Sequence, residues 1–265
     1  MTYTFGDGAG AAEVSRTLGL WRLWVHMSWQ DIRQRYRGSV LGPFWIAGGI
    51  AAASLGAGLL YSRVLRVDTH HLVAFVSVGV AVWTLIALTL TEACHAFVGS
   101  AGLIRNTNLP RPLHILRVLN RNLIVFAHGL LVVGIVFVVT GVGVGPQAFL
   151  AVPGLLLVVA NLIWAGWFLA LLSTRFRDAI QLTAYGLQFA IFITPIFWYP
   201  ELAGRDFAPL LFNPFYHLVE VVRGPLMGGG VAPESWWICA VMAVVGLSAA
   251  AVSFRSLHYR VAYWL

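Results

Sequence analysis

Long apolar runs dominate the pattern of hydrophobic and polar positions along this chain. Six of them have about the 20 residues that a helix needs to cross ~30 Å of hydrocarbon. Short, more polar connections separate the runs. The pattern predicts an all-α, polytopic membrane protein whose membrane domain, residues 39–265, contains six transmembrane helices. The predicted spans are Leu41–Tyr61, Leu72–Val98, Leu123–Val144, Leu150–Leu172, Ile180–Tyr199 and Trp236–Phe254.

The basic residues are distributed unevenly between the two sides of these spans. All seventeen are arginines, and thirteen of them lie in the amino-terminal region, the second and fourth connections and the tail. The other connections hold Arg63, Arg66, Arg205 and Arg223. Because basic residues near the ends of spans stay in the cytoplasm, both termini are predicted to be cytoplasmic. An even number of spans agrees with that orientation.

The composition excludes a soluble domain of ordinary surface chemistry. Hydrophobic residues make up 59% of the chain and charged residues only 10%, and the mean hydropathy is +0.81. The formal net charge of +7 is spread over segments that would face anionic lipid headgroups. Membrane lipids, and not nucleic acid, are therefore the expected partners of this charge.

An amphipathic segment precedes the first span. Residues 1–15 are rich in Gly and Ala and are predicted to be disordered. Between Leu18 and Arg37, large apolar side chains share one side of a helix and a polar arc lies beside it. This predicts a cytoplasmic helix over residues 16–38 that lies in the membrane interface, until Gly42 and Pro43 end it. It is either a simple anchor or a platform for a cytoplasmic partner or an anionic, lipid-linked substrate.

The chain contains no lysine. It therefore lacks a phosphate-binding loop of the type whose lysine reaches the β- and γ-phosphates of a nucleotide. Any ATP and Mg²⁺ must be bound by another subunit, and no cofactor or metal site is expected in this chain. Glu92 is the one acidic residue within a predicted span, so a relay of intramembrane carboxylates for proton-driven transport is not indicated either.

Three stretches, in order along the chain, resemble the type-2 ABC exporter permeases, specifically those for polysaccharide and O-antigen. They are residues 31–45, with the sequence DIRQRYRGSVLGPFW, Arg175–Asp178 and Asn213–Arg223. The resemblance implies a transport subunit of the bacterial inner membrane, not an enzyme. It also implies pairing with a second copy and with two ATP-binding subunits, and export of an undecaprenyl-linked glycan.

Two other functions stay open from the sequence. One is a drug or small-lipid exporter permease of the same superfamily. The other is a polytopic membrane enzyme acting on lipid-linked sugars, which would need a catalytic acid in a loop near the membrane. The candidates Asp68, Glu201 and Asp206 have no acidic partner or recognisable motif.

Two groups of candidate residues lie on the predicted cytoplasmic side. Glu92 and His95 are three residues apart and therefore share a helix face, where they would line a substrate entrance, reach the headgroups or pair with each other. The lipid pyrophosphate is expected to meet this entrance group: Arg33, Arg35, Arg37, Glu92 and His95. Gly99–Arg117 is predicted to be a stiff, polar connection instead of a long helix. The resemblance implies an ATPase-coupling group, which could alternatively only fix topology: Arg105, Arg111, Arg175, Arg177 and Asp178.

The predicted outer loop, residues 201–234, contains two short apolar pieces, Phe207–Phe212 and Phe215–Val222. Neither is long enough to cross, so two short re-entrant helices are expected before the last span. Asn213 is placed to cap a helix that begins at Pro214. Glu220 and Arg223 could form an exposed pair worth ~0–1 kcal/mol. The resemblance implies an outer gate here: Asn213, Pro214, His217, Glu220 and Arg223.

Aromatic side chains crowd the outer half of the fifth predicted span. They are Phe189, Phe192, Phe197, Trp198 and Tyr199. Such rings could line a channel, because the C–H faces of sugars stack on aromatic side chains. The alternative is an interfacial belt of Trp and Tyr.

Overall fold

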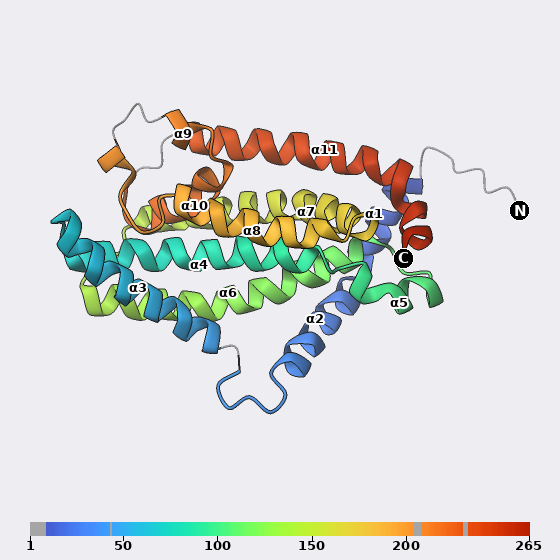
Figure 1. Cartoon of the computed structure of the whole chain (residues 1–265), viewed down its shortest axis with the longest axis horizontal. Coiled ribbons are helices and arrows are strands. Elements are labelled where there is room, and N and C mark those ends of the chain that lie inside the picture. The colour runs from blue at the N-terminus through green and yellow to red at the C-terminus, as the bar shows by residue number, and fades with distance from the viewer. Residues whose placement is uncertain (1–8, 43, 204–207, 230–232) are drawn as a thin grey trace, which may run out of the picture.

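A computed structural model describes residues 9–42, 44–203, 208–229 and 233–265. Within these residues the regular structure is helical. The first described helix, α1 (Ala9–Gly19), lies with α2 (Trp21–Arg35), α5 (Ala101–Asn106) and the carboxyl end of the chain at one end of the bundle (Figure 1). We call this the terminal end. The opposite end carries α9 (Ala208–Leu211) and α10 (Pro214–Leu226).

Five described helices are long and apolar enough to cross a membrane. They are α3 (Phe44–Leu65), α4 (Thr69–Ala93), α6 (Pro112–Thr140), α7 (Ala151–Arg175) with the 3₁₀ turn Pro146–Leu150 ahead of it, and α11 (Pro233–Trp264), whose membrane-length part is Pro233–Phe254. They coincide with five of the six predicted spans, and the prediction of a polytopic all-α membrane protein is confirmed.

The fifth predicted span, Ile180–Tyr199, corresponds to a shorter helix, α8 (Asp178–Ile193). Its 16 residues extend only about 24 Å at the usual helical rise. The helix ends because Pro195 has no backbone N–H and forces the preceding residue away from the helical region. Thr194 is accordingly extended, with ψ 127°. A count of six spans stays a prediction.

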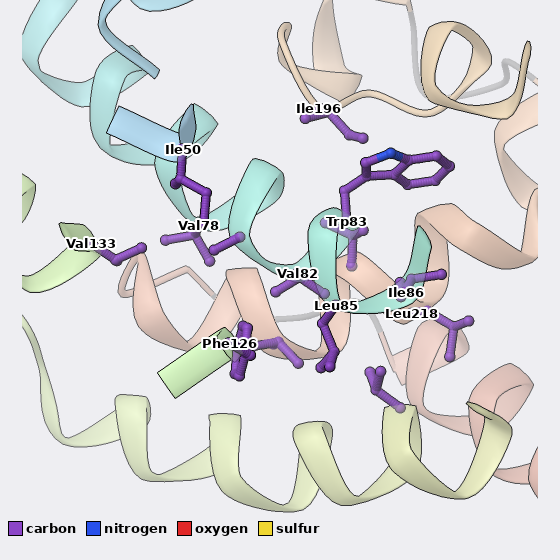
Figure 2. Packing of buried hydrophobic residues seen from close by; sticks show 14 of the residues in the cluster. Ile50, Val78, Val82, Trp83, Leu85, Ile86, Phe126, Val133, Ile196 and Leu218 are labelled. Atoms are coloured by element: carbon purple, nitrogen blue, oxygen red, sulfur yellow. The ribbon is translucent and has the colours of Figure 1, made fainter. Parts of the chain in front are cut away.

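Helix α4 forms the centre of the bundle. It packs against α3, α6, α7, α8 and α10, and most of its residues from Leu72 to Ala93 are buried. Figure 2 shows Val78, Val82, Trp83 and Leu85 of α4 between side chains from several neighbouring helices, among them Phe126 of α6. Because neighbouring helices enclose most of α4, Glu92 in its last turn is held in place.

The start of the chain differs from the prediction in two respects. Residues 9–15, predicted to be disordered, belong to α1, and residues 1–8 lie outside the described part. The predicted interfacial helix over residues 16–38 is divided at Leu20 between α1 and α2. Helix α1 is held because it packs on α6 and α11 and because Glu13 accepts a hydrogen bond from the Arg111 backbone N–H at 3.2 Å.

The polar connection predicted for Gly99–Arg117 is also more helical than expected. Helix α5 occupies Ala101–Asn106, and α6 begins at Pro112, well before the predicted span. Proline suits the first position of a helix because its fixed φ is already helical and no hydrogen bond is lost there. Arg117 and Arg121 are thus helical residues of α6, which brings them next to α2 and α4.

Candidate functional site: two polar clusters at opposite ends of the bundle

Five charged side chains form an ion-pair network at the terminal end, which we call the inner charge network: Asp31, Arg35, Glu92, Arg117 and Arg121. Asp31 of α2 accepts hydrogen bonds from Arg117 Nε at 2.7 Å and Nη2 at 2.5 Å, and from Arg121 Nη1 at 2.8 Å. Glu92 of α4 contacts Arg35 Nη2 at 2.6 Å and Arg121 Nη2 at 2.5 Å. Three helices are therefore joined through two carboxylates.

Most of this network is withdrawn from solvent. The side chains of Asp31, Glu92 and Arg121 are only 13%, 16% and 12% exposed. Asn122 Nδ2 adds a bond to Glu92 at 3.0 Å. Burial raises the pKa of the neighbouring Tyr36 phenol, and Glu92 adds to that effect while Arg35 and Arg121 oppose it. The network therefore fixes α2 on the bundle.

A cavity of about 350 Å³ adjoins the network, and His95 and His114 also line it. His114 is 1% exposed, and neither of its ring nitrogens has a hydrogen-bond partner among the described residues. Of the predicted entrance group, the structure brings Arg35, Glu92 and His95 to this cavity. Arg33 and Arg37 lie exposed outside it. Glu92 is paired with arginines, and His95 is exposed.

The predicted coupling residues divide into exposed and engaged ones. Arg105 is exposed at the end of α5, as are Arg175, Arg177 and Asp178 between α7 and α8. Arg175 also lies over the rings of Phe176 and Trp264, 5.5 and 5.3 Å from their centroids. Arg111 is engaged inside the chain, since its Nη1 is 4.0 Å from Glu13 Oε1. The exposed set could contact a separate subunit at the terminal end.

At the opposite end, Asn213 caps α10 as the sequence predicts. Its Oδ1 accepts the backbone N–H groups of Phe215 and Tyr216 at 3.0 and 3.3 Å, and Pro214 occupies the first turn. Its Nδ2 donates to the Ile193 carbonyl at 3.2 Å and to Thr194 Oγ1 at 3.0 Å. The same side chain therefore begins α10 and holds the end of α8.

His217 and Arg223 of α10 are both buried. His217 is 1% exposed, and its Nε2 lies 3.0 Å from the Leu211 carbonyl. Because a carbonyl can only accept, Nε2 carries a proton and donates it, and Nδ1 lies 2.9 Å from Ser235 Oγ. His217 thus joins the segment before α10 to the beginning of α11.

Glu220 and Arg223 form the predicted pair, but the prediction that this pair is exposed is wrong. Arg223 is 1% exposed, and its Nη2 lies 2.6 Å from Glu220 Oε2. Its Nη1 donates to the Pro195 carbonyl at 2.7 Å, and the guanidinium is 3.7 Å from the centroid of the Phe75 ring. The reason is that α10 is packed inward against α4 and α7. Arg223 therefore links α4, α10 and the break after α8.

Helix α10 approaches α7 closely, and it continues to Leu226, beyond the apolar piece Phe215–Val222 that the sequence predicts to be helical. A Cβ added at Gly154 of α7 would lie 2.0 Å from the carbonyl oxygen of Val221. Only glycine permits this approach. Of the gate region 201–234, residues 204–207 and 230–232, which include Phe207, Arg205 and Asp206, lie outside the described residues.

The five aromatic residues proposed to line a channel do not form one ladder. Phe189 and Phe192 of α8 are 66% and 76% exposed. Phe197 is partly buried and stacks on Tyr61 at 6.3 Å between centroids, and Trp198 is half-buried. The Tyr199 hydroxyl lies 3.0 Å from His71 Nδ1.

The exposed pair belongs to a longer apolar face of α8. Leu182 and Tyr185, which are 72% and 66% exposed, precede Phe189 and Phe192 at helical spacing, so all four lie on one side. The described part of the chain leaves this face uncovered. Asp68, one of the candidate catalytic acids, is engaged in the fold. Its carboxylate caps α4 by accepting the His71 backbone N–H at 2.7 Å.

The arrangement is that of a helical membrane protein whose polar contacts fix short helices at both ends of a bundle. Residues 22–227 match the model of the ABC-2 type transporter family, and the chain belongs to that family. It is thus the permease, the transmembrane transport subunit, of an ABC transporter. The match runs from α2 to the end of α10, so it includes both polar clusters.

Two relatives from Klebsiella pneumoniae are similar over almost the whole chain. Each bears the name O-antigen export system permease protein RfbA. They are 23% and 22% identical to this chain over 251 residues, which is 92% of this chain and 95% of each relative. The resemblance drawn from the sequence is therefore confirmed. Among the described residues, no group of three His, Cys, Asp or Glu side chains is placed to hold a metal ion.

Proposed function

We propose that this chain is the transmembrane subunit of an ABC transporter that exports a lipid-linked polysaccharide, such as O-antigen or capsule, across the bacterial inner membrane. Two copies would pair and work with two ATP-binding subunits, which bind ATP and Mg²⁺. The main support is the similarity to O-antigen export permeases along 92% of the chain. Both termini would be cytoplasmic, with the terminal end of the bundle inside.

The uncovered face of α8 favours a polymeric glycan as cargo. Tyr185, Phe189 and Phe192 present rings along one side of a helix, and successive sugars could stack on them as a chain passes. Ring contacts of this kind contribute about 0.5–1.5 kcal/mol each. These ring contacts depend little on which sugars the glycan contains. An apolar face would also suit a small amphiphile, so an experiment must distinguish a glycan exporter from a drug exporter.

Energy for export would come from the partner ATPase. Helix α5, whose last turn carries the exposed Arg105, and the turn between α7 and α8, with the exposed Arg175, Arg177 and Asp178, both lie at the terminal end of the bundle (Figure 1). They are the surface that we assign to ATPase docking. Arg111 is left out of this surface because it is engaged with Glu13.

Deleting the gene should trap the lipid-linked glycan on the cytoplasmic side of the membrane and remove it from the cell surface. Drug sensitivity should change little. Surface glycan is measured with a lectin or antibody on intact cells, and lipid-linked glycan in extracts. The gene restored on a plasmid is the control. Normal surface glycan together with intracellular accumulation of a fluorescent drug would instead support the drug-exporter alternative.

Arg33 and Arg37 should receive the pyrophosphate of the incoming lipid-linked glycan. Both are exposed on or just after α2, whereas Arg35 is bound to Glu92. Replacing Arg33 and Arg37 with Gln removes two charged contacts of about 1.5 kcal/mol or more each, so export should fall by about a hundredfold. The inner charge network stays intact in this variant.

The matched control is Arg22→Gln, which removes an exposed charge from the same helix and should leave export unchanged. Co-purification with the ATPase shows that each variant assembles. Export at the wild-type rate by the double variant would mean that Arg33 and Arg37 only fix topology.

A further inference from the structure

The last helix, α11, extends past the part that is long and apolar enough to cross a membrane. That part ends at Phe254, whereas the helix continues to Trp264. The extension, residues 255–264, adds about 15 Å at the usual helical rise, and we call it the α11 tail. It lies at the terminal end of the bundle (Figure 1), where α11 packs on α5. The tail is therefore beside the surface assigned to ATPase docking.

Apolar packing fixes the tail on two neighbouring helices. Val261 is fully buried and belongs to one cluster with Ile104 of α5 and Leu171 of α7. Trp264 packs against the same cluster and stays partly exposed. Ile104 directly precedes Arg105, and Leu171 lies about one helical turn before Arg175. The tail thus packs against both elements that carry the docking residues.

Trp264 also contacts one of the residues assigned to docking. The Cζ atom of Arg175 lies 5.3 Å from the centroid of the Trp264 ring, within the ~6 Å over which an aromatic face attracts a cation. Arg175 is the last residue of α7, and α8 begins at Asp178 without a side-chain cap from Arg177. The ring therefore restrains an exposed arginine at a turn that local capping does not fix.

We propose that Trp264 is a positioning residue for ATPase docking, whose ring holds the Arg175 side chain in the orientation that the ATP-binding subunit meets. A side chain that is already ordered loses less conformational entropy on binding, which strengthens the complex. The inference rests on the proposed docking at the terminal end. It adds the α11 tail to the docking machinery, although the tail lies outside residues 22–227, which match the family model.

Hydrogen exchange in the full chain alone, in nanodiscs, tests the restraint without an ATPase. The backbone N–H groups of Phe176 and Ala179 are bonded at the end of α7 and within the turn. Trp264→Ala should accelerate their exchange by about three- to fivefold, because local opening no longer breaks the ring contact. Tyr263→Ala removes the neighbouring ring, which is 89% exposed, and should change nothing. Unchanged exchange after Trp264→Ala would overturn the inference.

Affinity for the ATP-binding subunit that co-purifies with the wild type tests the positioning role. Trp264→Ala should weaken binding by about three- to fivefold, and Trp264→Phe should restore most of it because a phenyl ring also attracts the guanidinium. Trp264→Leu fills apolar space without a ring and should bind as weakly as Trp264→Ala. The matched control is Trp237→Ala, an exposed tryptophan near the other end of α11, which should bind like the wild type.

Equal rescue by Leu and Phe would mean that Trp264 only packs in the apolar cluster, and the inference would fail. A wild-type chain that binds no ATP-binding subunit would overturn the docking surface itself, with the exchange result unaffected. Wild-type binding with an equal affinity for Trp264→Ala would overturn only the role of Trp264. If Trp264→Ala elutes as an aggregate, Arg175→Gln removes the same contact from the other side and should accelerate exchange in the turn equally.

Discussion

Replacing Arg223 with Met should destabilise the protein by about 3–5 kcal/mol, the cost of removing one partner from a buried ion pair. The guanidinium is 1% exposed and bonds both Glu220 and the Pro195 carbonyl. Its loss leaves a carboxylate and a carbonyl without donors in an apolar environment. The free energy of unfolding, measured by titration with a denaturing detergent, reports the change.

Two further variants distinguish the loss of the planar contacts of Arg223 from the loss of its charge beside Glu220. Arg223→Lys keeps the charge but cannot reproduce the planar contacts to Glu220 and the Phe75 ring, so an intermediate loss is expected. The double variant Arg223→Met, Glu220→Leu should be more stable than Arg223→Met alone, because no carboxylate is left unpaired. Wild-type stability of Arg223→Met would show that the pair does not hold α10.

Replacing Glu92 with Gln should release α2 from the bundle and cost about 3 kcal/mol. Glu92 is the partner of both Arg35 and Arg121, and neutral Gln cannot balance two arginines. Hydrogen exchange should accelerate in the backbone amides of α2, while those of α4, which the apolar core encloses, change little. The loss of stability is measured in the same detergent titration.

A double-mutant cycle tests whether the network acts as one unit. Asp31→Asn and Glu92→Gln both remove a partner of Arg121, so their combined effect should be smaller than the sum. The control is Glu201→Gln, at an exposed acidic residue outside the network, where less than about 0.5 kcal/mol is expected. Unchanged exchange in α2 after both substitutions would contradict the role of the network.

The sequence predicts the membrane spans well where hydrophobicity alone decides. The exceptions have local causes. Helix α8 ends at Ile193 since Pro195 prevents its continuation, although the apolar run goes on. Helix α6 begins at Pro112, earlier than the predicted span. The arginines on its first turns resemble a polar connection in the sequence, because the carboxylates that pair with them lie in distant segments. Hydropathy reports how well a segment suits burial in lipid, and it takes no account of charges that pair with each other in the fold.

Local capping is also predictable, but distant pairing is not. Asn213 precedes a proline, and that pattern alone specifies the cap of α10. Asp31 and Arg117 are 86 residues apart, so nothing in either segment indicates the other. The one available signal was the spacing of Arg117 and Arg121, four residues apart and hence on one face if helical. Likewise, the burial of Arg223 follows from how α10 packs on α4 and α7.

ATP-driven movement of lipid-linked glycan across the membrane tests the central claim most directly. Inside-out vesicles would carry this chain, the separately encoded ATPase and a radiolabelled lipid-linked glycan, and protection from an added glycosidase would report transport into the lumen. We expect protection to require ATP, this chain and an active ATPase, and to fall with the Arg33 and Arg37 double variant. Glycan that stays fully digestible in the presence of ATP and an assembled complex would contradict the account.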